Sequence, residues 1–344
     1  MRNKETLDFL LPVPYTNCNR TRHASGFTMR NPAGLFLREV LAMNPYPKRI
    51  LTIPQQLKSY IDAGMTISSA DKATDALSTI GYYRLRGYSF HLYDNASKQY
   101  RPGTDFSDIL NLYHFDTELS QLLFGLVTCI EVALRARLSD ALLTYNDALI
   151  LTDPSVFSDK KLFWQNLSSL SSQVARSNDV FIRHNFHNHD GEIPLWAAVE
   201  IMSFGTLSKT IKNLKTGSAS AYSILADYYR YRSPRGRLVK PSLQMLSSWI
   251  QSVSILRNMC AHNSRIYNRT INTFPELLIA DRLTPVPLHN GLYQVLLAMK
   301  YLRPTDEIWK SFFTDLQNLF AKYNGFFDLN CMNFPSDWIA HFTL

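Results

Sequence analysis

The chain has 344 residues, of which 46% are hydrophobic and 19% charged, so it can bury a sizeable core and is not wholly disordered. Its formal net charge of +8 is unevenly placed, because residues 201–270 hold eleven Lys or Arg residues against a single acidic residue, Asp227. This local excess favours an anionic partner, with nucleic acid the first candidate, and no apolar run reaches the roughly 20 residues that a membrane-spanning helix needs.

Neither the cysteines nor the start of the chain indicates export. The four cysteines are far apart and show no C-x-x-C spacing, which is typical of reduced, mostly buried thiols. The apolar run Phe9–Leu11 is too short for a secretory signal, and prolines interrupt it. We therefore predict a soluble, cytoplasmic protein with no membrane partner.

The first part of the chain differs from the rest. Residues 1–46 mix Pro, Asn and Gly with scattered Arg, and predict an irregular arm with a short helix at 35–43. If Met43 is the natural start, the residues before it are an upstream extension. Residues 47–105 then predict a helical subdomain. Its first helix is capped at Thr52 and ends at Gly64.

A larger helical domain is predicted at 106–305, followed by a helical segment and tail at 306–344. Apolar residues recur at three- and four-residue steps and predict two long helices, at 106–145 and 241–266. Between them we predict a helix broken near Gly205 and a turn-rich stretch around 185–194. Strand signals are scarce, so the fold class is all-α.

The sharpest motif is RNMCAHN, in which Arg257 precedes His262 by five positions and Asn258 follows the arginine directly. This Arg-x4-His pattern resembles the signature of the HEPN ribonucleases. Four further motifs, in the same order, resemble the Abi family of abortive-infection proteins (the AbiD and AbiF type). They are GYYRLRGYSF at Gly81 to Phe90, LYHFDTELSQLL at Leu112 to Leu123, IEVALRARL at Ile130 to Leu138 and PLWAAVEIMSFGTLSK at Pro194 to Lys209.

The resemblance implies a HEPN-like helical bundle with additional N-terminal helices, and a metal-independent endoribonuclease of phage defence that needs no cofactor. Arg257 and His262 would be its catalytic pair. The chemistry fits, because RNA can be cleaved by its own 2′-hydroxyl when a histidine moves the protons and an arginine stabilises the phosphate. A surface or capping arginine and a hydrogen-bonded core histidine are the alternative interpretation of the two residues.

Helix geometry limits this site. If the helix runs through His262, five residues turn about 500° and leave Arg257 and His262 roughly 140° apart, whereas Asn258 and His262 share a face. The resemblance implies that two copies of the motif meet in a homodimer and form one composite cleft. Asn258 either orients a catalytic side chain or caps the preceding turn.

Glu131 and Arg135 form an i, i+4 pair on an otherwise apolar predicted helix. An internal ion pair is the plain explanation, because a buried charge needs a partner. Alternatively, Glu131 orients Arg257 or His262 from a neighbouring helix.

A basic cluster precedes the second long helix. It consists of Arg230, Arg232, Arg235, Arg237 and Lys240, with tyrosines interleaved and with Pro234 and Gly236 predicting a loop. Arginine planes and aromatic rings suit phosphates and unpaired bases, so we predict RNA contacts here and at Arg265 and Arg269. A solvated charged loop is the alternative.

The segment RHNFHNHDG gathers His184, His187, His189 and Asp190. We interpret it as an exposed turn rather than a metal site, because its spacing is irregular, and we expect no metal. Trp196 and Glu200, a few residues later, are expected to be core and cap residues.

An RNA-cutting activity must be restrained in healthy cells, so the resemblance implies an inhibitor: a bound small noncoding RNA, a protein antitoxin or an autoinhibited dimer. The rival function is a non-catalytic RNA-binding protein on a HEPN fold. Loss of Arg257 or His262 would have indicated it, and both are present.

Overall fold

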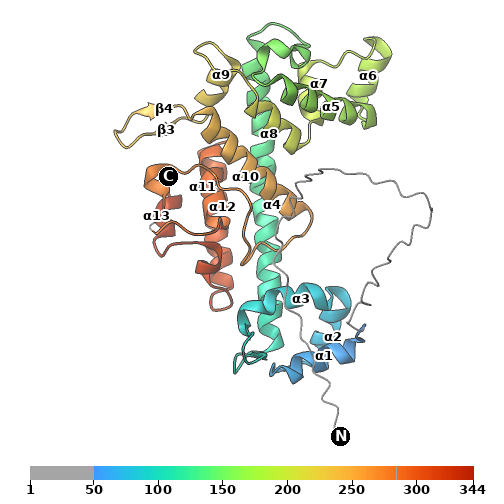
Figure 1. Cartoon of the computed structure of the whole chain (residues 1–344), viewed down its shortest axis with the longest axis vertical. Coiled ribbons are helices and arrows are strands. Elements are labelled where there is room, and N and C mark those ends of the chain that lie inside the picture. Colours follow the sequence, from blue (N-terminus) through green and yellow to red (C-terminus); the bar gives the residue numbers. More distant parts are fainter. Residues whose placement is uncertain (1–49, 284) are drawn as a thin grey trace, which may run out of the picture. The chain divides into compact units, whose positions relative to one another are not determined.

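The structure of the protein is a computed structural model that describes residues 50–283 and 285–344 (Figure 1). The predicted irregular arm, with its short helix at 35–43, lies outside the described residues. The described part is mostly helical, so the predicted all-α fold is confirmed. Its α-helices are α1 (Ile53–Asp62), α2 (Ala70–Thr79), α3 (Tyr82–Ser89), α4 (Phe106–Leu143), α5 (Lys160–Arg176), α6 (Val180–Asn188), α7 (Leu195–Ile201), α8 (Phe204–Lys212), α9 (Ala221–Asp227), α10 (Leu243–Ala261), α11 (Leu292–Leu302), α12 (Asp306–Lys322) and α13 (Trp338–Phe342).

Strands are few and short. β1 (Tyr93–Asp94) pairs antiparallel with β2 (Gln99–Tyr100), and β3 (Tyr231–Arg232) pairs antiparallel with β4 (Leu238–Val239). The second hairpin lies in the segment predicted as a basic loop. Its turn depends on Gly236, whose φ of 74° is in the region that favours glycine.

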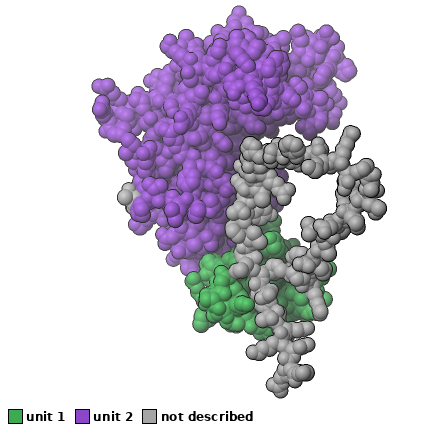
Figure 2. All heavy atoms as spheres, viewed as in Figure 1, with its two compact units in different colours: residues 1–110 green, residues 111–344 purple. Residues whose placement is uncertain are grey.

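The chain divides after Leu110 into two compact units (Figure 2). In the described part of the first unit, α1 begins as the sequence predicts, because the Thr52 backbone N–H donates to Gln55 Oε1 at 2.8 Å. The fully buried Tyr60 ring packs edge-on against Phe106, with ring centroids 5.4 Å apart.

The second unit, residues 111–344, contains the rest of α4 and all later elements. There α10 packs against α8 and α11 (Figure 1). Trp249 of α10 is fully buried and stacks on Tyr301 of α11, with ring centroids 5.2 Å apart. This packing fixes the direction of α10 and therefore the position of the residues at its C-terminal end.

Two of the predicted helix boundaries are wrong. The second long helix ends at Ala261 rather than Ile266, and His262 is its C-cap residue. The predicted turn at 185–194 begins with helical residues, because α6 continues to Asn188. The break near Gly205 is present but falls earlier, where the Ser203 side chain caps α8 by accepting from the Thr206 N–H.

One described helix, α4, is long and apolar enough to cross a membrane. A core helix of a soluble protein has the same features, and many of the apolar residues of α4, such as Leu119, Ile130 and Leu134, are fully buried in the structure. The fold is therefore consistent with the predicted soluble protein. Among the described cysteines Cys260 is buried, but Cys129 is exposed, contrary to the prediction of mostly buried thiols.

Candidate active site

The carboxylate of Glu131 is the centre of the candidate site. It lies on α4, is 6% exposed, and accepts from the Arg135 guanidinium at 2.6 Å through Oε1. Its other oxygen, Oε2, lies 3.7 Å from Nε of Arg257 on α10. The geometry is therefore compatible both with an internal ion pair to Arg135 and with a role of Glu131 in orienting Arg257, because one carboxylate faces two arginines from different helices. Two guanidinium charges against one carboxylate leave a net charge of +1.

Arg135 ties this centre to a third helix. Its Nε donates to the Val199 carbonyl at 3.0 Å, and its guanidinium also donates to the Met202 carbonyl at 2.8 Å. These carbonyls lie at the C-terminal end of α7, where carbonyl groups have no partner within the helix. Arg135 thus satisfies carbonyls of α7 and fixes the Glu131 carboxylate at the same time.

Arg257 is held from one side and open on the other. Its side chain is 36% exposed, while its Nε is buried and faces Glu131 without a hydrogen bond, since 3.7 Å is too long for one. Its Nη1 lies 3.5 Å from the side-chain oxygen of Asn258. The outer edge of the guanidinium is therefore available to an anion, and a planar fork of donors suits a phosphate.

His262 is exposed at the end of α10. Its backbone N–H donates to the Asn258 carbonyl at 3.0 Å, which is the last turn of the helix, and Asn263 then takes a positive φ of 48°. The helix therefore terminates directly at His262. No direct contact between the Arg257 and His262 side chains is found within the described chain, so α10 brings them to the same helix end without pairing them.

A buried carboxylate that the sequence analysis missed fixes the chain after His262. Asp116 of α4 is 3% exposed and accepts from the backbone N–H groups of Ile266, at 3.1 Å, and Tyr267, at 2.6 Å. A usable signal was present, because Asp116 lies on the apolar face that Leu112 and Leu119 define. Two charge-assisted hydrogen bonds hold the segment that follows the candidate histidine against α4.

The predicted RNA-binding residues divide into two groups. Arg230 and Lys240 both pair with Asp227, at 2.5 and 2.7 Å, at the base of the β3–β4 hairpin. Arg235 and Arg237 are exposed in its turn. Arg232 is exposed as well, and donates to the Gly236 carbonyl at 3.3 Å. Arg265 and Arg269 instead follow His262, at the opposite end of α10.

The His-rich segment is helical rather than a turn, because His184 and His187 lie in α6 and His189 is its C-cap residue. Within residues 50–283 and 285–344, no three His, Cys, Asp or Glu side chains are grouped so that they could hold a metal ion. The expectation that Trp196 is a core residue is wrong, because Trp196 is 59% exposed. The exposed Glu200 is not a cap residue either, since Pro194 and Met202 cap α7. Since α7 buries Leu195, Ala198 and Val199 instead, its other face is left open.

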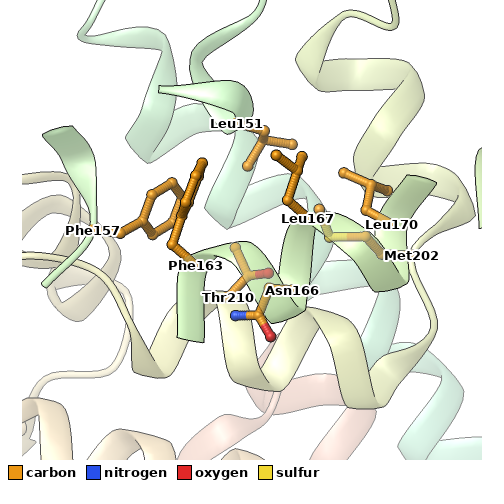
Figure 3. Close-up of a pocket in the computed structure, with 8 residues that line it drawn as sticks. All are labelled: Leu151, Phe157, Phe163, Asn166, Leu167, Leu170, Met202 and Thr210. Carbon is orange, nitrogen blue, oxygen red and sulfur yellow. The ribbon is translucent and has the colours of Figure 1, made fainter. Parts of the chain in front are cut away.

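A small internal cavity lies near α5 and α8 and is lined mainly by apolar side chains (Figure 3). Its volume is about 10 Å³, which has room for about one water molecule. The Asn166 side chain lines it and has a buried Nδ2 without a protein partner. The cavity is therefore too small for a nucleotide, and the candidate site remains the open surface around Arg257 and His262.

The fold and the site define an all-α protein that presents an anchored arginine and an exposed histidine at the end of one helix. The family model of the Abi-like proteins matches residues 75–268, which is more than half of the chain. The chain therefore belongs to the Abi-like protein family, and this membership indicates a role in abortive-infection defence against phage. No curated protein and no solved structure matches the chain.

Proposed function

We propose that the protein is a metal-independent endoribonuclease of the HEPN type that acts in abortive-infection defence, with Arg257 and His262 as its catalytic pair. The observation that carries this proposal is the ion network Arg135–Glu131–Arg257, in which Arg257 lies on the helix that ends at the exposed His262. The buried carboxylate attracts the guanidinium to one position before any phosphate arrives. Preorganised charge of this kind is the largest single contribution to many enzymatic rate enhancements.

In the proposed reaction the RNA supplies its own nucleophile. The 2′-hydroxyl attacks the adjacent phosphorus, the bond to the 5′-oxygen breaks, and the products carry a 2′,3′-cyclic phosphate and a 5′-hydroxyl. His262 exchanges protons with the hydroxyl or the leaving oxygen, and Arg257 stabilises the charge on the phosphorane. Asn258, next to Arg257, supports the orientation of the guanidinium.

We propose a homodimer as the active form, because Arg257 and His262 do not pair within one chain. The exposed face of α4 supports this. Gln121, Gly125, Thr128, Cys129, Val132 and Ala136 are all exposed, recur at three- and four-residue steps, and carry no charge. This uncharged stripe runs past Glu131, so a twofold contact between two α4 helices would bring two copies of the site together.

The β3–β4 hairpin is the proposed RNA-binding arm. It precedes α10, whose 19 residues span about 28 Å, so the exposed Arg232, Arg235 and Arg237 lie far from His262 along the helix. These arginines and Arg265 and Arg269 would contact phosphates at separate points along the RNA. We further propose that a noncoding RNA, a protein antitoxin or the dimer itself restrains the activity in healthy cells.

The test compares the wild-type protein with Arg257→Ala, Arg257→Lys and His262→Ala on total cellular RNA in EDTA, followed by analysis of the 3′ ends. The wild type is expected to leave cyclic phosphates. Arg257→Ala should cut about 10²- to 10³-fold more slowly and His262→Ala about 10²- to 10⁴-fold. Arg257→Lys should recover little activity, because an ammonium cannot form the planar fork.

Arg176→Ala and His187→Ala are the matched controls, since both residues are exposed on other helices of the same unit and should cut like the wild type. Cutting by all variants at the wild-type rate would show that the proposed site is wrong. A wild type that binds RNA tightly but leaves it intact would favour the rival function, a non-catalytic RNA-binding protein.

A further inference from the structure

A hollow of about 370 Å³ opens between α6 and α7. Phe181, His184 and Asn185 of α6, His189 at its end, and Trp196 and Glu200 of α7 line it. This volume is within the range of small-molecule sites, which combine aromatic walls with a few polar groups. The proposed nuclease chemistry uses none of these residues.

Two of the wall residues are aromatic rings without a ring partner among the described residues. Trp196 is 59% exposed and Phe181 is 40% exposed, and neither ring packs on another ring in the described part of the chain. His184 and His189 lie against each other, with ring centroids 5.3 Å apart. Large exposed rings that gather around one hollow indicate a flat ligand that stacks on them.

The polar groups add a defined pattern. The Asn188 amide donates to His184 Nδ1 at 3.0 Å, so in the neutral ring the proton lies on Nε2, which becomes a donor. Glu200 makes no hydrogen bond or ion pair with the described residues, and its carboxylate offers two acceptors side by side. The hollow therefore combines stacking surfaces with one imidazole donor and one double acceptor.

We propose that this pocket binds an unpaired guanine base. Guanine presents two adjacent donors, N1–H and N2–H, which match both oxygens of the Glu200 carboxylate, while its O6 and N7 accept from an imidazole N–H. Adenine and cytosine each place a ring-nitrogen acceptor beside their amino group, and that acceptor would face the carboxylate. Uracil has a single donor between two acceptors. A methylated ammonium would satisfy Glu200 and the rings but leave the imidazole donor without a partner.

The same short helix connects this pocket to the candidate active site. Trp196 and Glu200 line the pocket, and the carbonyls of Val199 and Met202 accept from Arg135, which holds Glu131 beside Arg257. A guanine in the pocket would therefore select which nucleotides of an RNA reach Arg257. This use of the pocket rests on the proposed nuclease function, whereas recognition of the base itself does not.

The experiment measures binding by the full-length His262→Ala protein, which is expected to cut RNA too slowly to disturb the measurement. The probes are GMP, AMP, CMP and UMP, tetramethylammonium, and two oligouridylates of equal length, one of which contains a single guanosine. Calorimetry gives the affinities. GMP should bind more tightly than the other nucleotides, and Glu200→Gln should weaken GMP binding about 5- to 150-fold, the usual worth of a paired base contact.

Glu192→Gln is the matched control, because it removes the same charge from an exposed residue outside the pocket lining and should leave GMP binding unchanged. Trp196→Ala should also weaken binding. Equal binding of all four nucleotides, a preference for tetramethylammonium, or GMP binding that ignores Glu200→Gln would overturn the proposal.

Two comparisons show whether the guanine belongs to an RNA or to a free nucleotide. Tighter binding of the guanosine-containing oligouridylate, abolished in Glu200→Gln, indicates an RNA base, whereas GMP binding without that preference indicates a free guanine nucleotide. Both conclusions come from binding alone. If the nuclease proposal is wrong, the wild type will not cut RNA but GMP will still bind, so the failure of one proposal is distinguishable from the failure of the other.

Discussion

The two ends of α10 are both basic, yet they hold their arginines in opposite ways. At the N-terminal end, Arg235 and Arg237 are exposed in the turn of a two-stranded hairpin, and the acidic partner at its base is the partly exposed Asp227. At the C-terminal end, Arg257 lies against Glu131, a buried carboxylate that Arg135 and α7 fix in turn.

This difference separates RNA binding, at the N-terminal end, from catalysis, at the C-terminal end. A phosphate chain can be held by mobile, exposed charges, because binding depends mainly on their number and sign. Stabilising a transition state requires a charge whose position is set in advance, and a buried counter-charge provides this. The C-terminal end of α10 meets that requirement, and the hairpin does not.

Among changes that leave Arg257 and His262 in place, the largest expected effect comes from removing the counter-charge at the C-terminal end. Glu131→Gln keeps the shape of the side chain but loses the charge that holds Arg257 and Arg135, and it should reduce kcat about 10- to 100-fold with little change in KM. Single-turnover cleavage of a defined RNA measures this. Glu118→Gln, on the same helix but paired with Lys322, is the control and should cut normally. An unchanged kcat in Glu131→Gln would mean that Glu131 serves stability alone.

The next effect concerns the segment that follows His262. Asp116→Ala removes the acceptor of two backbone N–H groups, and leaves them buried without partners. The free energy of unfolding should fall by about 1–3 kcal/mol, which denaturant titration measures. Ser120→Ala, one turn later on α4, should change it much less. If Asp116→Ala lost no stability, water would have to replace the carboxylate as acceptor.

A smaller effect is expected at the N-terminal end of α10. Arg235→Ala combined with Arg237→Ala should weaken RNA binding without changing the cleavage rate at saturating RNA. The slope of log affinity against log salt should decrease by about 0.7 for each phosphate of a single strand that the protein no longer neutralises. Arg176→Ala is the control for a remote positive charge. A lower kcat in the double variant would show that the two ends are not separate in function.

The smallest effect tests the proposed dimer through its thiols. Cys129 lies on the uncharged stripe of α4 and should be alkylated several-fold more slowly once the protein is concentrated enough to pair. Burial raises the pKa of the Cys260 thiol to about 11, so this thiol stays neutral at pH 7–9 and should react slowly at every concentration. Peptide mapping by mass spectrometry measures both rates. A Cys129 rate that is independent of concentration would place the dimer contact elsewhere.

Periodicity predicted the long helices because their apolar faces repeat over many turns, and α4 ends within two residues of its predicted end. Local patterns could not predict where α10 ends, since Asp116, 150 residues away, contributes to holding the segment after His262. They also misplaced Trp196, because apolar character usually indicates burial, and the packing of α7 on α5, together with its hydrogen bonds to Arg135, decides which face is left open. Side chains were predictable where one helix decides them, and unpredictable where several helices meet.

Two contacts of α4 fix the spacing between Arg257 and the segment that follows His262. Glu131 and Asp116 are 15 residues apart, about 22 Å along the helix, and they hold the chain on either side of His262. Gly125 lies between them, exposed and with no atom within 4 Å of where its side chain would be. A binding partner that bent α4 at Gly125 would shift Glu131 and Asp116 relative to each other. It would thereby change the spacing of Arg257 and His262 without touching either residue.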